Sequence, residues 1–227
     1  MFFIRTSFIE QLSYSSSVKS VEPVDQKTLT YHLKQLAQLD SDLAQAVDRY
    51  GAPAPRQRPE GFETFLSTIV SQQISTAAAN TIMNRVRAAL PSLTPEGLDQ
   101  VTDAALRAAG LSTRKIEYAR GLALASQTGA LSIDQLSSLE DAQVIEHITR
   151  LRGFGAWSAE IYCMFSLGRP DIFPAGDLAL QIALGRLKGL EIKPTPKEAR
   201  ALTQHWQPYR TAGALFLWHY YHGIPNA

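Results

Sequence analysis

Cysteine and net charge are both scarce in this chain. Cys163 is the only cysteine among 227 residues, which excludes an internal disulfide and any zinc site or iron–sulfur cluster built on several thiolates. Lys and Arg number 22 against 21 Asp and Glu, so a surface for a polyanion has to be local. The apolar start, MFFIRTSFIEQL, contains Arg5 and Glu10 and is too short for a signal peptide or a membrane span. We expect a soluble protein without a membrane partner, in a reducing compartment.

The sequence divides into a short arm and one folded domain. The serine-rich stretch SYSSSVKS predicts a flexible arm over residues 1–24. A serine-rich start with few acids also leaves an organelle-targeting segment open. We expect residues 25–227 to fold, because an apolar fraction of 45% is enough for a sizeable core.

Helical spacing dominates the folded part. Leucines 29, 33, 36 and 39 recur at three- and four-residue steps in a first helical unit that ends at Gly51, and FETFLSTIV predicts a buried helix followed by a bend at Gln72 and Gln73. No series of alternating strands and no internal repeat is visible, so we predict an all-α fold. Helix starts are expected after these residues: Ser75, Thr94, Thr102, Ser112 and Thr195.

The turn LRGFG lies between two predicted helices, DAQVIEHITR and AWSAEIYCMFSLG. Gly153 and Gly155 allow a tight turn and the close approach of a ligand, since neither carries a side chain. The next helix presents unpaired N–H groups that favour a phosphate, and the Ser158 hydroxyl adds a donor in the first turn. The alternative is an ordinary connection between two helices in which the glycines only shorten the turn.

Four stretches together resemble a known family. LRGFGAWSA, FPAGDLAL, VSQQIS and WQPYRTAGALFLW are similar to segments of the helix-hairpin-helix DNA glycosylases, in the 3-methyladenine glycosylase II (AlkA-type) branch. The resemblance runs from about Phe62 to Trp218. It implies a two-lobed helical fold with the active-site cleft between the lobes, one lobe from about 62–150 and the other from the N-terminal helices and about 151–227. Too few residues precede VSQQIS for an N-terminal β domain, so the compact all-helical form is expected.

Asp177 is the catalytic residue that the resemblance implies, and it follows Trp157 by twenty residues as the family spacing requires. A base alkylated at a ring nitrogen is already a good leaving group, so one carboxylate suffices to stabilise the positive sugar and to orient or deprotonate water. The alternative is that Asp177 only caps the helix LALQIALGRL. Both descriptions can hold together.

Trp157 stands where bifunctional relatives carry a lysine nucleophile. Without that amine, water is the expected nucleophile and the enzyme is monofunctional. The resemblance also places Trp218 as a base-stacking residue, so the two indoles would form the base pocket, where an electron-rich ring attracts a cationic base. The alternative for both tryptophans is ordinary core packing.

Other contacts with DNA follow from the resemblance alone. Gln73 occupies the wedge position that fills the space left by a flipped nucleotide; otherwise it is a polar residue at a helix junction. Ile161 and Leu178 replace aromatic residues of the larger AlkA enzymes, so the substrate range is not transferable. Six cations are candidates for phosphate contacts or, alternatively, solvated surface charges: Arg85, Arg87, Arg114, Lys115, Arg150 and Arg152.

The chemistry is expected to need no cofactor. The family often holds a monovalent cation, Na⁺ or K⁺, on backbone carbonyls of the hairpin, at the positions of Thr149, Leu151 and Phe154. Such carbonyl ligands leave no side-chain pattern in a sequence. This site therefore rests on the resemblance.

We predict a DNA glycosylase of base-excision repair that acts on alkylated purines in double-stranded DNA and leaves an abasic site. We expect a monomer located in the cytoplasm at the bacterial nucleoid, or in the nucleus of a eukaryote. Two alternatives stay open. One is a non-catalytic helix-hairpin-helix DNA-binding module, and the other is a glycosylase for deaminated or oxidised bases. No P-loop, zinc-ligand series or nucleophile elbow suggests another enzyme class.

Overall fold

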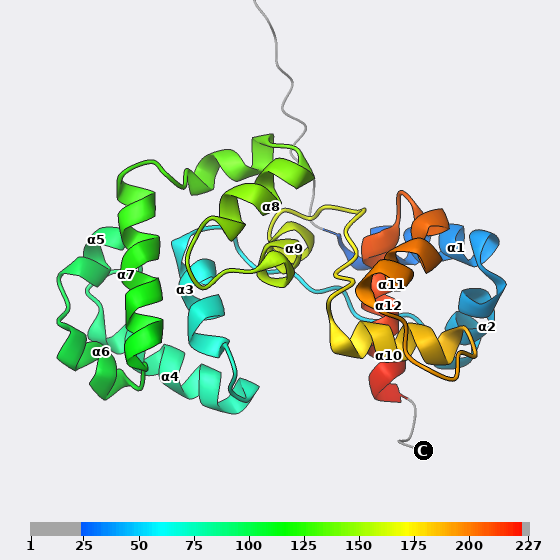
Figure 1. The fold of residues 1–227 in the computed structure, drawn as a ribbon, viewed down its shortest axis with the longest axis horizontal. Coiled ribbons are helices and arrows are strands. Elements are labelled where there is room, and N and C mark those ends of the chain that lie inside the picture. The colour runs from blue at the N-terminus through cyan, green and yellow to red at the C-terminus, as the bar shows by residue number, and fades with distance from the viewer. Residues whose placement is uncertain (1–23, 224–227) are drawn as a thin grey trace, which may run out of the picture.

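The computed structural model describes residues 24–223, and all regular elements within this range are helices (Figure 1). Apart from Val24, which is buried in the core, the arm predicted over residues 1–24 lies outside the described residues. Within the described range no helix is long and apolar enough to cross a membrane. The α-helices are α1 (Gln26–Leu39), α2 (Ser41–Tyr50), α3 (Phe62–Ser71), α4 (Thr76–Ala89), α5 (Pro95–Asp99), α6 (Asp103–Ala109), α7 (Thr113–Gln127), α8 (Asp141–Thr149), α9 (Ala156–Phe165), α10 (Leu178–Leu187), α11 (Pro196–Leu202) and α12 (Arg210–Gly223), with short 3-10 segments at Ile133–Ser138 and Gln204–Trp206.

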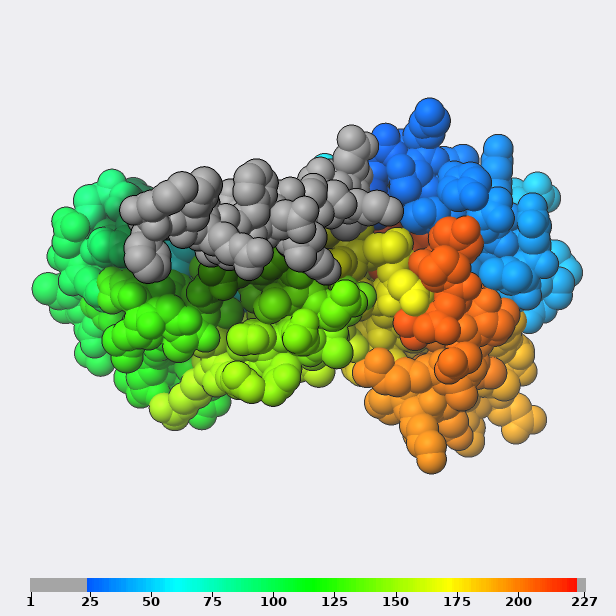
Figure 2. All heavy atoms as spheres, turned by 90° about the horizontal axis from the view of Figure 1, so that it is seen from above, coloured from blue at the N-terminus to red at the C-terminus, as the bar shows by residue number. Residues whose placement is uncertain are grey.

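The helices form two groups, as the predicted two-lobed all-α fold requires. In one group α3 packs against α4 and α7, while α5 and α6 pack against α7. In the other, α12 packs against α1, α2 and α10. The pair α8 and α9 lies between the groups in Figure 1, and Figure 2 shows α1 and α2 beside the segment after α10 at one end of the molecule. The residue bounds of the lobes stay a prediction.

Local capping signals explain where the helices begin. Each of the five predicted starts is confirmed, because the hydroxyl of the residue accepts a hydrogen bond from a backbone N–H in the first turn of α4, α5, α6, α7 or α11. The predicted bend at Gln72 and Gln73 is also present between α3 and α4. The first helical unit, however, is two helices, because the extended backbone of Asp40 separates α1 from α2.

A proline-rich connector, residues 51–61, carries the chain from α2 in one group to α3 in the other. The backbone N–H of Arg58 donates to the carbonyl of Phe165 at the end of α9, at 2.9 Å. The side-chain amide of Gln57 donates to the carbonyl of Val24 at 3.3 Å. These two bonds fix the path of the connector along the junction between the helix groups.

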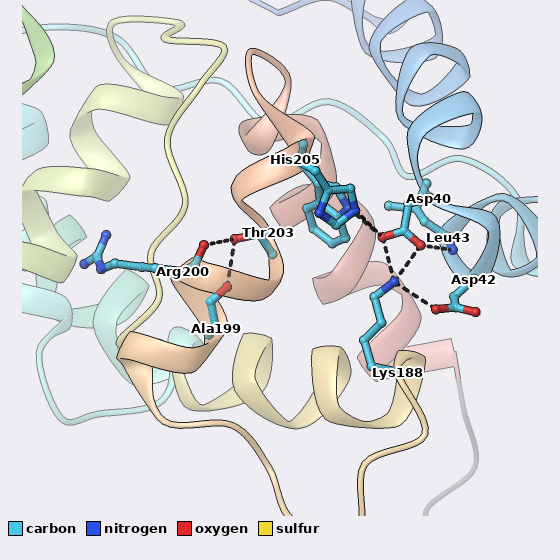
Figure 3. A network of polar contacts seen from close by, with 9 residues as sticks. Asp40, Asp42, Leu43, Lys188, Ala199, Arg200, Thr203 and His205 are labelled. Carbon is cyan, nitrogen blue, oxygen red and sulfur yellow. Dashed lines mark hydrogen bonds and ion pairs between the residues drawn. The ribbon is translucent and has the colours of Figure 1, made fainter.

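Asp40 is the centre of a buried polar network that holds the second helix group together (Figure 3). Its side chain is 1% exposed. Its carboxylate accepts from Lys188 Nζ at 2.7 and 2.8 Å, from Trp206 Nε1 at 2.7 Å and from the backbone of Leu43 at 3.2 Å, and it lies 3.1 Å from His205 Nε2. Burial opposes ionisation of Asp40, but the bonds from Lys188 and Trp206 outweigh it and lower its pKa to about 2.

We predict that Asp40→Asn lowers the free energy of unfolding at pH 7 by about 3 kcal/mol, because the partly buried ammonium of Lys188 loses the buried one of its two carboxylate partners and Trp206 loses a charged acceptor. Since the pKa of Asp40 is lower in the folded protein, its contribution is present above about pH 4 and is lost as the pH falls toward 2. Urea unfolding followed by circular dichroism at several pH values measures the difference between wild type and variant. Asp25→Asn is the control, because Asp25 caps α1 through Thr28 without this network. An equal pH dependence in wild type and Asp40→Asn would contradict the prediction.

Candidate active site

Asp177 is the N-cap of α10, at the end of a loop that is fixed by its own helix. One carboxylate oxygen, Oδ1, accepts from the backbone N–H of Leu180 at 3.0 Å. The backbone N–H of Asp177 donates to the carbonyl of Pro174 at 2.9 Å. The buried side chain of Gln181, one turn into α10, donates to the carbonyl of Ala175 at 2.8 Å. The position of the carboxylate is therefore set by the loop and the first turn together.

Two tryptophans from other helices donate to the same carboxylate. Trp157 Nε1, in the first turn of α9, lies 2.8 Å from Asp177 Oδ2, and Trp218 Nε1, on α12, lies 3.2 Å from Oδ1. These bonds were not predicted, because the sequence indicated the indoles only as walls of a base pocket. The alternative description of Asp177 as a helix cap is correct, since its carboxylate accepts from the backbone of Leu180. Capping uses one acceptor, however, and leaves the two indole bonds unexplained.

The two indoles differ in exposure. Trp157 is 47% exposed, whereas Trp218 is 7% exposed and lies beside the ring of Phe165, with centroids 6.0 Å apart. Core packing therefore accounts for part of the placement of Trp218 but not for that of Trp157. Of the two positions that lack the aromatic residues of larger relatives, Ile161 is buried and Leu178 is 58% exposed beside Asp177.

The hairpin between α8 and α9 needs glycine at one of its two predicted positions. Gly153 has φ +97°, and a Cβ there would collide with the ring of Tyr118 on α7. Gly155, the N-cap of α9, has φ −105° and ψ 178°, an extended conformation open to any residue, and a Cβ would meet nothing within 4 Å. The turn therefore requires glycine at position 153, whereas the backbone at position 155 would accept another residue. The absence of a side chain at Gly155 therefore affects only how closely a ligand can approach this backbone.

The turn that holds Gln73, the predicted wedge residue, spans residues 71–75 and is called the wedge turn after that prediction. It is tied to the hairpin by a residue that the sequence did not indicate as functional. Gln72 Nε2 donates to the carbonyl of Gly153 at 2.8 Å. Next to it, the exposed Gln73 adopts φ +57°, a left-handed conformation that is uncommon outside glycine. A hollow of about 450 Å³ lies between the two segments, and four of the predicted site residues line it. It is lined by Thr68, Ser71, Gln72, Gln73, Tyr118, Gly153, Trp157 and Ser158.

The three predicted carbonyl ligands lie at the turn of the hairpin. Thr149 is the last residue of α8, and its hydroxyl donates back to Ile145 at 2.8 Å. The carbonyl of Leu151 already accepts from the backbone N–H of Phe154 at 3.1 Å, which closes the turn, and a carbonyl oxygen keeps a second lone pair for a cation. Among the described residues no group of three or more His, Cys, Asp or Glu side chains is arranged to hold a metal ion.

Several of the predicted phosphate-binding cations already have partners. Arg87, Arg150 and Arg152 form ion pairs with glutamates at 2.7, 2.5 and 3.5 Å. Lys115 Nζ donates to the carbonyl of Val70 at 2.7 Å, and burial lowers its pKa. Arg85 and Arg114 form no ion pair with any residue that the structure describes. The exposed ion pairs contribute little to stability, so their arginines remain available to a phosphate.

A comparison with protein families identifies the fold and the hairpin together. The model described as HhH-GPD superfamily base excision DNA repair protein matches residues 66–208, from within α3 to just before α12. The chain belongs to this superfamily. The match includes the wedge turn, the hairpin and Asp177, and the predicted family is thereby confirmed.

Known members of the superfamily are similar over most of their length. DNA-3-methyladenine glycosylase 1 of Schizosaccharomyces pombe is 30% identical over 191 residues, which are 82% of this chain and 84% of the relative. A crystal structure of DNA-3-methyladenine glycosidase from Bacillus halodurans has 37% identity and a TM-score of 0.73, covering 82% of this chain and 87% of that one. The Schizosaccharomyces pombe 3-methyladenine DNA glycosylase, solved in complex with abasic DNA, has 30% identity and a TM-score of 0.73, with coverages of 83% and 95%.

The hairpin glycines should respond differently to alanine. Gly153→Ala should destabilise the fold by about 2 kcal/mol or more, because the backbone strain of a positive φ adds to the cost of the collision with Tyr118. Gly155→Ala should leave the melting temperature unchanged and weaken binding to damaged and undamaged duplex equally, since a phosphate contact carries no sequence information. Thermal melting and fluorescence anisotropy measure the two effects.

Gly129→Ala is the control for backbone strain, because Gly129 also has positive φ but its Cβ would meet no neighbour. A stable Gly153→Ala protein would contradict the collision. Unchanged affinity of Gly155→Ala for both duplexes would favour the alternative of a mere turn.

Proposed function

We propose that this protein is a monofunctional DNA glycosylase of base-excision repair that hydrolyses the N-glycosidic bond of alkylated purines. The observation that carries the proposal is the convergence of two indole N–H groups on the carboxylate of Asp177. The similarity to proteins named DNA-3-methyladenine glycosylase over more than four fifths of the chain supports the reaction. The relative solved with abasic DNA supports a duplex as substrate and an abasic site as product.

The geometry suits a reaction in which positive charge develops on the sugar. A purine alkylated at a ring nitrogen is cationic and leaves as a neutral base, so the sugar takes over the positive charge. Asp177 faces it with an anion held by three N–H donors, from Leu180, Trp157 and Trp218. Because the carboxylate is already fixed, it needs no reorganisation as the charge develops. The same carboxylate orients the water that adds to the sugar.

The base must leave the duplex before its bond to the sugar is reached. Gln73, exposed in the wedge turn, is proposed to fill the vacated space, while Gly155, Ser158 and the start of α9 bind the backbone phosphate. The bond between Gln72 and Gly153 joins these two contacts. Trp157 and Trp218 are proposed to border the base pocket as well as to hold Asp177.

The hairpin carbonyls of Thr149, Leu151 and Phe154 suit a monovalent cation, because K⁺ and Na⁺ bind neutral oxygen ligands. A bound cation would add positive charge beside the phosphate, and the chemistry at Asp177 does not depend on it. The monomeric state and the location at the nucleoid, or in a eukaryotic nucleus, stay predictions.

A non-catalytic DNA-binding module is less consistent with the site. Such a module needs the hairpin but gives no reason for a carboxylate that accepts from two indoles of different helices. A preference for deaminated or oxidised bases differs from the proposal only in the base released. Base release from duplexes that each carry one defined lesion distinguishes the two.

We predict that Asp177→Asn removes the charge at nearly constant shape and lowers single-turnover base release more than 100-fold, on the order of 3 kcal/mol. Duplex affinity and melting temperature should stay near the wild-type values, since asparagine also caps helices. Asp25→Asn makes the same change at the cap of α1, away from the site, and should leave base release unchanged. Wild-type release by Asp177→Asn would refute the role of the carboxylate.

The products should show that water is the nucleophile. Because Trp157 replaces the amine of bifunctional relatives, alkylated duplex should yield free base and an intact strand that breaks only after hot alkali. Borohydride added during the reaction should trap no covalent protein–DNA adduct. Strand breaks without alkali, or a trapped adduct on a denaturing gel, would contradict the water mechanism.

A further inference from the structure

Arg56, in the proline-rich connector, reaches the candidate active site although no motif pointed to it. Its guanidinium carbon lies 5.8 Å from the centroid of the Trp218 ring, the indole that donates to Asp177. Arg56 is exposed and forms no ion pair with any described residue. The residues after it are anchored, Gln57 to Val24 and Arg58 to Phe165. The connector therefore holds this cation at the site.

Two side chains, Arg56 and Phe165, lie beside the Trp218 ring, and of these only Arg56 is exposed. The indole is 7% exposed, and the ring of Phe165 beside it belongs to the core. Displacing Phe165 would open the core, whereas displacing Arg56 moves one exposed side chain. A base that stacks on Trp218 has to share the indole ring with this guanidinium or displace it.

A positive charge beside the base acts in opposite directions on two classes of substrate. A base alkylated at a ring nitrogen enters as a cation, so the guanidinium repels it and competes with it for the electron-rich ring. A neutral damaged base gains negative charge as its bond to the sugar breaks, so the same guanidinium stabilises its departure. The charge therefore shifts the preference of the site toward neutral bases.

We infer that Arg56 is a specificity-determining residue that restrains excision of cationic purines and extends the substrate class to neutral damaged purines. This inference rests on the glycosylase function proposed above. The pKa of the Arg58 guanidinium is lowered, mainly by its burial and to a smaller degree by the nearby charge of Arg56. A second cation next to Arg56 increases the positive potential over the connector.

The test compares single-turnover excision of 7-methylguanine, a cationic base, and hypoxanthine, a neutral one, from duplexes of the same sequence. Arg56→Gln should raise the rate for 7-methylguanine and lower that for hypoxanthine, changing their ratio about tenfold. Arg56→Lys keeps the charge and should stay within about twofold of the wild-type ratio. Where hypoxanthine release is too slow to measure, the rate for 7-methylguanine alone decides.

Arg49→Gln is the matched control, because the guanidinium carbon of Arg49 lies 5.3 Å from the Tyr50 ring at the end of α2. It should leave the ratio unchanged. A wild-type ratio in Arg56→Gln overturns the inference, and so does an equal loss with both substrates, which would identify Arg56 as a contact to the DNA backbone. If the wild-type protein releases neither 7-methylguanine nor any other alkylated purine, the proposed function itself fails, and this outcome is distinct from an unchanged ratio.

Discussion

The hydrogen bonds of two indoles to one carboxylate are the constraint on which the candidate site depends. Trp157, Asp177 and Trp218 belong to α9, to the start of α10 and to α12, and hydrogen bonds of 2.8 and 3.2 Å leave little tolerance in how these helices meet. The packing of α12 against α10 and the bond from Gln181 to the loop serve this geometry. Lys193 supports Gln181 in turn, at 2.9 Å. A small shift of any of these helices would separate donors from acceptor.

Features encoded by a few neighbouring residues were predictable from the sequence. A hydroxyl before a helix caps it through a backbone N–H three residues on, so Thr94, Ser112 and Thr195 indicate helix starts without tertiary information. The spacing of the hairpin and the aspartate likewise placed Asp177 at a loop end and at an N-cap. The same local reasoning could not distinguish Gly153 from Gly155, because a pair of glycines does not reveal which of them adopts a positive φ.

Contacts between distant residues could not be predicted, because no local pattern encodes them. The bond from Gln72 to Gly153 joins residues 81 positions apart, and that from Lys188 to Asp40 joins residues 148 apart. The resemblance indicated the wedge and the hairpin separately but not the bond between them. Arg56 was missed for the same reason, since a proline-rich connector has no periodicity that would show which side chain faces the site. Only the packed fold assigns these residues a partner.

All three tryptophans donate to the carboxylate of an aspartate that caps a helix, and the surroundings decide what that carboxylate does. Asp40 accepts from Trp206, is buried and has the ammonium of Lys188 as counter-charge, so its negative charge is neutralised within the fold. Asp177 accepts from Trp157 and Trp218, is half-buried and forms no ion pair with any residue that the structure describes. A neutral indole N–H fixes a carboxylate without cancelling its charge, whereas a lysine fixes and cancels it. The site thus keeps an oriented, uncompensated anion next to the start of α9. An anion of this kind suits a reaction in which positive charge develops on the sugar of the substrate.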